Sequence, residues 1–290
     1  MATIRQVRSR IKVAKNIQQI TKAMKMVAAA RLKRAQDRVQ AARPYARAMR
    51  EMMTSLARAA ADSAELPGME KRAPRNIGFL IVTSDRGLAG SYNSSLLRRV
   101  VELLKDYDKD RVKLYVAGRK GIAFLKRRGF NVVHEFAFAN TGVTYADARD
   151  ITRILREDFE KGQIDQLFMV YNRFLSAISQ KPTDVQLLPL QTPETDDTAV
   201  SEEVEDYIFE PSAEVLLRAL MSRYLEGQTY QALLEATASE HGARMTAMSS
   251  ATDNAGKMIT SLTLQLNRAR QAGITREISE IVGGAEALKV

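Results

Sequence analysis

The chain has 290 residues, of which 45% are hydrophobic, so it can fill an ordinary core in one or two domains. It contains no cysteine, which excludes disulfides, thiolate metal ligands and a cysteine nucleophile. The sequence has no run of about eighteen apolar residues that could span a bilayer, and its first ten residues lack the apolar segment of a secretory signal.

The net charge of +10 is distributed unevenly along the chain. Residues 1–60 carry 15 Lys or Arg against only Asp37 and Glu51, whereas residues 191–210 hold eight acidic residues and no basic one. A segment with a net charge of +13 indicates an acidic protein surface, a phosphate backbone or an anionic lipid surface as its partner. Charge alone does not choose among these three.

The first sixty residues predict a long helix. Thr3 and Gln6 have the spacing of a capping box, and the pattern then runs to about Ala61 with Pro44 as its only interruption. The apolar spacing keeps its phase across Pro44, so we expect a kinked but continuous helix. From Leu32 onward, apolar residues recur alternately three and four positions apart, which is typical of a coiled-coil seam. This seam comprises Leu32, Ala35, Val39, Ala42, Ala46, Met49, Met53 and Leu56.

Before Leu32 the apolar pattern is less regular, and we expect a phase slip that locally alters the supercoil. The methionines of this segment most simply fill the coiled-coil core, but Met24 and Met26 could instead face a partner that moves against them. The expected seam positions here are Ile4, Val7, Ile11, Ile17, Ile20, Met24 and Val27.

Residues 62–76 form a polar connector, and the segment that follows predicts an α/β domain over residues 77–190. Strand-like runs alternate with helical patterns, which favours a mainly parallel sheet. We expect strands at 77–83, 112–117, 130–136, 167–171 and 184–190, and helices near 94–107, 119–128 and 145–161.

A second long helix is predicted after Pro211, the last proline of the chain, over residues 212–290. Internal glycines weaken this prediction, and Gly283 and Gly284 are expected to loosen the end of the helix. The seam of this helix comprises Met245, Met248, Thr252, Ala255, Ile259, Leu262, Leu266 and Ala269.

Each long helix has an apolar stripe too narrow to be buried alone. One helix begins the chain and the other ends it, so we expect the two to pair as a long antiparallel coiled coil. The predicted fold class is therefore α/β, with a Rossmann-like domain (77–190) between an N-terminal coiled-coil helix (1–61) and a C-terminal one (212–290).

No catalytic, cofactor or metal site emerges from the sequence. The segment from Ser84 to Gly90 follows the first strand, where α/β folds bind phosphates, but it matches neither a dinucleotide fingerprint nor a Walker loop. We therefore interpret it as a tight turn whose Asp85 and Arg86 make local or interface contacts. His134 and His241 are far apart in sequence and more simply serve in packing than as a metal pair.

Four segments together resemble the gamma subunit family of the bacterial-type F-type ATP synthase. They are ITKAMKMVAAARLKRAQ (20–36), ARPYA (42–46), TSDRGLAGSYN (83–93) and ATDNAGKMITSLTLQLNRARQAGITREISEIVGGA (251–285). The resemblance implies a central rotor shaft that is not itself an enzyme. It would couple rotation of a proton-driven membrane ring to conformational cycling of the catalytic subunits, and it would bind no cofactor.

The resemblance also implies partners and contact residues. The partners would be the alpha and beta subunits of the catalytic head, the epsilon subunit and the membrane ring of c subunits, with neither nucleic acid nor direct bilayer insertion. The protein would lie at the cytoplasmic face of the bacterial plasma membrane as a peripheral protein. Lys25 departs from relatives that have an acid at this position. The implied contacts are Arg270 and Gln271 near the end of the shaft, Lys22, Met24 and Lys25 at a swivel region, and Tyr207 and Glu210 at the ring.

The basic face of the first helix adds a further expected contact. Lys33, Arg34 and Arg38 are predicted to meet acidic loops of the catalytic subunits. Two alternative functions remain open at this point. A nucleic-acid-binding coiled coil would explain the basic segment, although Tyr45 is the only aromatic residue among the first sixty. An α/β enzyme with a coiled-coil dimerisation arm would need a convergent site, which the sequence does not show.

Overall fold

The computed structural model describes residues 4–59, 74–138, 142–189, 210 and 212–287. Contacts divide the chain into two compact units, Met1–Ala28 with Met245–Val290 and Ala29–Arg244. Two long helices, α1 (Ile4–Ala59) and α5 (Ala213–Ala287), contribute residues to both units.

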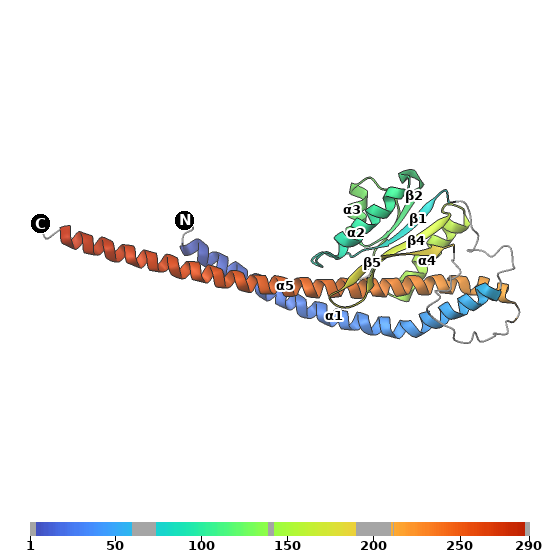
Figure 1. The fold of residues 1–290 in the computed structure, drawn as a ribbon, viewed down its shortest axis with the longest axis horizontal. Helices are drawn as coiled ribbons and strands as arrows, with labels where there is room; N and C mark the ends of the chain where they lie inside the picture. Colours follow the sequence, from blue (N-terminus) through green and yellow to red (C-terminus); the bar gives the residue numbers. More distant parts are fainter. Residues whose placement is uncertain (1–3, 60–73, 139–141, 190–209, 211, 288–290) are drawn as a thin grey trace. The chain divides into compact units, whose positions relative to one another are not determined.

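The larger unit, Ala29–Arg244, is built on a five-stranded sheet with the order β3-β2-β1-β4-β5 (Figure 1). Strand β1 pairs in parallel with β2 and with β4, β2 pairs in parallel with β3, and β5 is antiparallel to β4. The expected mainly parallel sheet is thus confirmed. The strands are β1 (Ile77–Val82), β2 (Val112–Ala117), β3 (Val132–Phe136), β4 (Gln166–Phe174) and β5 (Gln180–Leu188).

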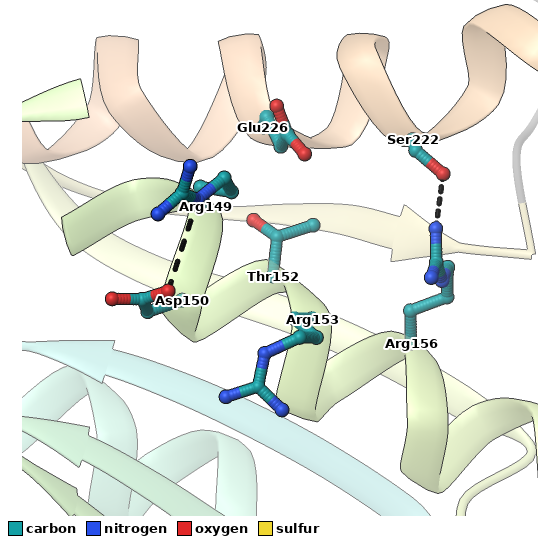
Figure 2. Close-up of a pocket in the computed structure, with 7 residues that line it drawn as sticks. All are labelled: Arg149, Asp150, Thr152, Arg153, Arg156, Ser222 and Glu226. Carbon is teal, nitrogen blue, oxygen red and sulfur yellow. Dashed lines mark hydrogen bonds and ion pairs between the residues drawn. The ribbon is translucent and has the colours of Figure 1, made fainter. Parts of the chain in front are cut away.

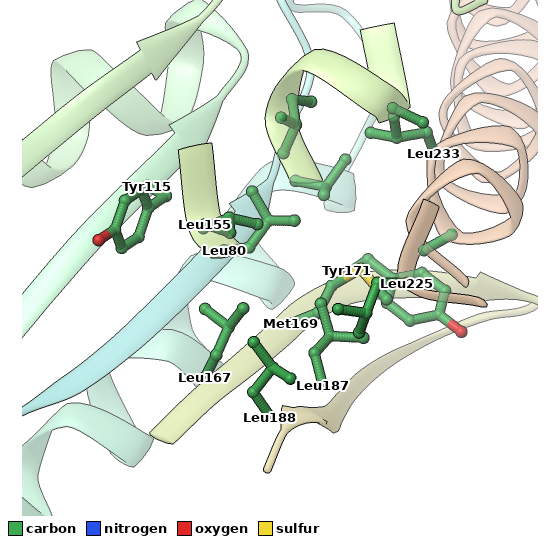
Figure 3. Packing of buried hydrophobic residues seen from close by; sticks show 14 of the residues in the cluster. Leu80, Tyr115, Leu155, Leu167, Met169, Tyr171, Leu187, Leu188, Leu225 and Leu233 are labelled. Atoms are coloured by element: carbon green, nitrogen blue, oxygen red, sulfur yellow. The ribbon is translucent and has the colours of Figure 1, made fainter. Parts of the chain in front are cut away.

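Helices cover both faces of this sheet. Helices α2 (Tyr92–Leu103) and α3 (Arg119–Arg127) pack on one face, where Leu96 and Leu125 join alternate residues of β1. Helix α4 (Tyr145–Glu160) and part of α5 pack on the other, where Leu155 and Leu225 meet Leu80 and Met169 (Figure 3). Because both faces are covered, β1 is buried at all six positions, which explains its uninterrupted apolar sequence.

Within the same unit, the second half of α1 packs against the first half of α5. Met53 and Leu56 of α1 are buried against Leu217 of α5. A Cβ atom added at Gly227 would meet the Tyr45 ring at 3.7 Å, so higher residue numbers on one helix face lower numbers on the other. The helices are therefore antiparallel here, and the seam predicted from Leu32 to Leu56 consists of buried or half-buried side chains.

In the smaller unit, α1 and α5 are again antiparallel. Thr252 donates a hydrogen bond to the Thr21 hydroxyl at 2.8 Å, and Lys25 donates one to the Ser249 hydroxyl at 2.9 Å. A Cβ atom at Gly256 would come within 3.1 Å of the Gln18 amide nitrogen. The two chain segments thus run in opposite directions here as well.

The expected phase slip before Leu32 is wrong. The least exposed positions of α1 recur in a constant heptad phase, three, four or seven residues apart, through Val7, Ile11, Ala14, Gln18, Thr21 and Ala28. Ile17, Ile20 and Val27, which the sequence interpretation assigned to the seam, are 47–59% exposed. From Ala14 to Ala28 the seam follows small or polar residues, which permit the close approach to α5 at Gln18 and Thr21.

The element boundaries differ from the expected ones mainly at β5. This strand starts at Gln180 rather than at residue 184, because it lies at the sheet edge, where Pro182 removes no ladder hydrogen bond that the sheet needs. Helix α5 continues through all its internal glycines, including Gly283 and Gly284, where a loosened end had been expected. Helix α1 likewise continues through Pro44. Thr3 of the expected capping box lies outside the described residues.

Candidate functional site

The residues expected to contact partners on the first part of α1 are mostly accessible. Lys22 is exposed and Met24 is half-buried. Lys25 is exposed too, but its ammonium group donates a hydrogen bond to the Ser249 hydroxyl of α5.

Beside these residues lies an outward apolar stripe that the sequence interpretation missed as a surface. We use this name for Val13, Ile17, Ile20 and Val27, which are all about half exposed, at 47–59%. They recur at heptad spacing one residue before the seam positions Ala14, Gln18, Thr21 and Ala28. The signal that could have revealed the stripe was the presence of two adjacent heptad patterns, of which only one can face α5. Met26 lies nearby and is 61% exposed.

The basic residues expected to meet acidic loops lie on the solvent side of α1 in the larger unit. Lys33 pairs with Asp37 at 2.9 Å on its own helix, and Arg34 is exposed. Arg38 is exposed as well, although one of its guanidinium nitrogens lies 3.5 Å from the Val143 carbonyl oxygen. These exposed pairs hold the side chains only weakly, so the charges stay accessible to a partner.

The remaining expected contacts are well separated along the chain. Arg270 and Gln271 are exposed on α5 in the smaller unit, and Glu210 is exposed in the larger one. Tyr207 lies outside the described residues. Near Arg270, the apolar side chains of Ile274, Ile278 and Ile281 are 44–71% exposed, so this part of α5 presents apolar surface.

The place where an open α/β sheet usually binds its ligand is filled in this protein. Ligands bind outside the carboxyl ends of the strands where the winding direction reverses, which here lies between β1 and β4. The Tyr92 hydroxyl, following β1, donates to the Ala236 carbonyl of α5 at 3.2 Å. The Ser239 hydroxyl of α5 donates to the carbonyl of Asn172 in β4 at 2.9 Å. Helix α5 therefore occupies this crevice.

The turn after β1 makes local contacts, as the sequence predicted. Asp85 accepts a hydrogen bond from the backbone nitrogen of Arg119 at 3.0 Å, at the start of α3. Gly118 precedes that helix with φ +99°, and a Cβ atom there would lie 2.4 Å from the Thr83 carbonyl oxygen, so only glycine fits. Leu88 also has positive φ, at 61°, and is 64% exposed at the turn.

A buried group of charged side chains lies under this turn. Arg244 of α5 is 8% exposed and donates to Glu240 at 2.6 Å and to the Gly87 carbonyl at 3.2 Å. Burial raises the pKa of Glu240, while Arg244 acts in the opposite direction. Burial, with the positive charges of Arg244 and Arg31, lowers the pKa of His241 to about 4, so this histidine is neutral near pH 7.

A cavity of about 350 Å³ lies between α4 and α5, and the charged side chains that line it are paired with other side chains of the protein rather than left for a ligand (Figure 2). Arg153 and Arg156 pair with acids one turn along α4, and Arg156 also donates to the Ser222 hydroxyl of α5. Arg149 lies 3.8 Å from Asp150. The arginines are thus balanced by carboxylates. The lining comprises Arg149, Asp150, Thr152, Arg153, Arg156, Ser222 and Glu226.

Neither a metal site nor a membrane span is found in the described part of the chain. Among these residues no group of three or more His, Asp or Glu side chains is placed to hold a metal ion. His134 stacks on Tyr115 instead, with ring centroids 5.7 Å apart, and so serves in packing as expected. None of the described helices is long and apolar enough to cross a bilayer.

The fold and these surfaces define a class of protein: a coiled coil with an attached Rossmann-like domain whose usual ligand crevice is filled by its own helix. Comparison with known proteins narrows this class. The ATP synthase family profile matches residues 3–288. The ATP synthase gamma chain of Desulfitobacterium hafniense is 47% identical over 289 residues, covering 100% of both chains. That of Brevibacillus brevis is 48% identical over 286 residues, covering 98% of each. The chain therefore belongs to the family of ATP synthase gamma chains.

Solved structures agree with this assignment. A chain from the central stalk and c-ring of the Tetrahymena thermophila mitochondrial ATP synthase is 28% identical, with a TM-score of 0.60, covering 80% of this chain and 99% of that one. A chain of the Euglena gracilis mitochondrial ATP synthase has a TM-score of 0.69 at 19% identity, covering 98% and 94%, and shares the fold. The coiled coil with a Rossmann-like domain is thus the fold of this family.

Proposed function

We propose that this chain is the central rotor shaft of an F-type ATP synthase, coupling rotation of a membrane ring of c subunits to conformational cycling of the alpha and beta subunits. The observation that carries the proposal is the outward apolar stripe of α1, with Ile17 and Ile20 about half exposed beside a seam that contains the polar residues Gln18 and Thr21. A helix pair that presents its apolar side chains outward is completed by an enclosing partner. We propose the catalytic head of the ATP synthase as that partner.

The two long helices differ in charge and apolar surface, so the shaft presents unlike faces to the subunits around it. A partner shifts a conformational equilibrium only by interacting differently with the states concerned. Rotation of an asymmetric shaft would offer each catalytic subunit a different face in turn. Lys22, Met24 and Lys25 would contribute to one contact, and the basic side chains of Lys33, Arg34 and Arg38 to another.

The proposal includes a foot at the membrane ring. Tyr207 and Glu210 would contact the c subunits, and the epsilon subunit would bind the same end of the protein. The chain would then lie at the cytoplasmic face of the bacterial plasma membrane as a peripheral protein. Removal of the membrane potential should leave the chain bound to the ring, and its release by a mild salt wash that keeps the ring and head together would contradict the foot assignment.

We further propose that the chain is not itself catalytic and binds no nucleotide. The filled crevice between β1 and β4 supports this, because α5 occupies the position that a nucleotide would take. Isothermal titration of the purified full chain with ATP and magnesium tests the proposal directly. Saturable binding in the micromolar range would overturn it.

The decisive experiment on the shaft concerns Arg270 and Gln271. Arginine offers five donors in a fixed fork, so it can hold a carboxylate or carbonyl in one rotational position and release it in the next. Both side chains are exposed, so replacing them with Ala should leave the chain folded and assembled. The rate of proton pumping driven by ATP hydrolysis should fall. Arg98→Ala, an exposed arginine on α2, is the control. Normal coupling in the assembled double variant would refute the role of this pair.

The basic face of α1 can be tested by charge reversal. Lys33→Glu, Arg34→Glu and Arg38→Glu in one chain should weaken assembly with the catalytic head. Single changes should have little effect, because an exposed ion pair contributes only about 0.2–1 kcal/mol. A triple reversal of Arg98, Lys120 and Arg127, which are exposed on the sheet domain, matches the change in charge. Equal assembly of the two triple variants would show that this face of α1 meets only solvent.

A further inference from the structure

One stretch of α5, Ala236–Arg244, contacts β4, the turn between β4 and β5, the turn after β1 and the start of α2. From β4, the Asn172 carbonyl accepts a hydrogen bond from Ser239, whose side chain is fully buried. Asn172 also donates through its own amide to the Tyr92 carbonyl at 3.1 Å, so the contacts from β4 and from the start of α2 are linked. The Tyr92 hydroxyl in turn donates a hydrogen bond to the Ala236 carbonyl of α5.

The turn between β4 and β5 approaches the same stretch very closely. Gly242 is buried, and a Cβ atom added to it would lie 3.0 Å from the Ala177 carbonyl oxygen and 3.3 Å from the Ala177 Cα. Backbone cannot retreat as a flexible side chain can, so even alanine at this position would push the turn away from the helix. Gly242 thus permits direct contact between the turn and α5.

The turn after β1 approaches α5 from a different direction, through Arg244. Its guanidinium donates to the carbonyl oxygens of Gly87 and Arg86, at 3.2 and 3.5 Å, while Glu240 neutralises its charge from one helical turn away. Arg244 is buried, so breaking these bonds would leave a desolvated charge without its partners. This arrangement resists separation of the turn from the helix.

These contacts lie on two sides of α5. Successive residues of an α-helix are rotated by about 100°, so Gly242 and Arg244 are about 200° apart around the axis. Ser239 lies on the same side as Gly242, and Glu240 on the same side as Arg244. The β4 side of the crevice therefore holds one face of the helix, and the turn after β1 holds the nearly opposite face.

We propose that this two-sided contact, which we call the grip, transmits torque between the sheet domain and α5, with Gly242 and Arg244 as its positioning residues. The inference rests on the proposed rotor function. It adds the site at which the sheet domain, which would contact the ring, is fixed to α5, which would form the shaft. A helix held on one apolar face can turn about its axis with little loss of contact. A helix held on two opposite sides through directional hydrogen bonds cannot.

The test uses two matched glycine variants of the full chain in the assembled membrane complex. Gly242→Ala places a Cβ atom against backbone at 3.0 Å, whereas Gly227→Ala, in the same helix and the same unit, meets only the Tyr45 ring at 3.7 Å. The arginine set comprises Arg244→Ala, Arg244→Lys as the conservative variant, and Arg98→Ala as an exposed control.

Two measurements, hydrogen exchange and the number of protons pumped per ATP, test the grip separately from the rotor function. Hydrogen exchange in the complex should become about tenfold faster in the turns at 84–90 and 175–179 for Gly242→Ala and Arg244→Ala, equivalent to about 1.4 kcal/mol of local stability, and should be unchanged for both controls. The same two variants should hydrolyse ATP at the wild-type rate but pump fewer protons per ATP, and Arg244→Lys should recover part of the loss.

Unchanged exchange in both grip variants would overturn the grip as a physical contact. Faster exchange with wild-type pumping per ATP would show that the contact exists but carries no torque, which also overturns the inference. Neither result would touch the rotor proposal, because that proposal depends on the wild-type complex and on the Arg270 and Gln271 variant. Loss of pumping in Gly227→Ala equal to that in Gly242→Ala would likewise refute the inference, since it would trace the effect to the loss of helical glycine.

Discussion

Helices α1 and α5 pair in both units of the protein, but through different side chains. In the larger unit, Met53 and Leu56 are buried against Leu217, as in an ordinary hydrophobic core. In the smaller unit, the seam instead contains a hydrogen bond between the hydroxyls of Thr21 and Thr252. Several large apolar residues of that part of α1, Val13, Ile17, Ile20 and Val27, are about half exposed, whereas Val7 is buried.

This difference changes how much apolar surface each region buries by pairing within its own chain. Burial of an apolar side chain contributes about 1.5–3 kcal/mol, whereas an intramolecular hydrogen bond contributes a net of only about 0.5–1.5 kcal/mol. In the smaller unit, Ile17 and Ile20 are left about half exposed by the chain's own packing, and the proposed catalytic-head contact would cover them. Such a region suits a shaft that works inside other subunits.

The largest effect on stability is expected at the apolar seam. Leu56 is 1% exposed, so Leu56→Ala removes buried methyl groups and leaves a cavity. We expect the free energy of unfolding to fall by about 2–5 kcal/mol, measured by urea denaturation of the full chain. Met26→Ala, at a position that is 61% exposed, is the control and should change stability by less than about 0.5 kcal/mol. Similar losses of stability in the two variants would contradict the difference between the buried seam and the exposed positions of α1.

The next effect concerns pH and the buried histidine of the larger unit. The pKa of His241 is about 4 in the folded chain and about 6.5 when unfolded, so the unfolded state binds its proton first as the pH falls. The stability that neutral His241 contributes is complete above pH 6.5 and is lost between pH 6.5 and about 4, by at most about 3.4 kcal/mol. When the free energy of unfolding is measured across this pH range, it should fall less steeply for His241→Gln than for the wild type.

A smaller effect is expected at the hydroxyl pair of Thr21 and Thr252 in the smaller unit. Thr21→Val leaves the Thr252 hydroxyl without one of its partners, so it should cost about 1 kcal/mol, whereas Thr21→Val with Thr252→Val replaces both groups by apolar ones of the same shape and should be nearly neutral. Thermal unfolding of the two singles and the double forms a double-mutant cycle. Strictly additive losses would indicate that the hydroxyl pair contributes nothing as a pair.

The smallest effect on stability is expected at the outward apolar stripe. Ile17→Gln with Ile20→Gln alters two side chains that are 47% and 59% exposed, so the unfolding free energy of the isolated chain should change by no more than about 0.5 kcal/mol. Assembly with the catalytic head should nevertheless weaken, as measured by the amount of chain retained with the head on gel filtration. Full retention would show that the stripe is not a partner surface.

The sequence by itself determined the features that depend on local periodicity. Heptad spacing from Leu32 to Leu56 predicted the seam of α1, and the alternation of apolar runs with helical patterns predicted the α/β domain. The exposure of Lys22, Arg34 and Arg270 agrees with roles on a surface, and those roles stay predictions. These features depend on residues a few positions apart, so a single chain segment contains the information.

Only the tertiary structure decided which of two adjacent stripes of α1 faces α5, because Ile17 and Thr21 each belong to a heptad pattern and the choice depends on Ser249 and Thr252, more than two hundred residues away. It likewise decided that α5 fills the crevice of the sheet. In the sequence, Glu240 and Arg244 have the spacing of an ordinary solvated pair along a helix. Their burial arises from the turn after β1, whose carbonyl oxygens lie about 157 residues away along the chain. Such long-range packing leaves no periodic signal in the sequence. It is this packing that brings Glu240 and Arg244 into the proposed grip.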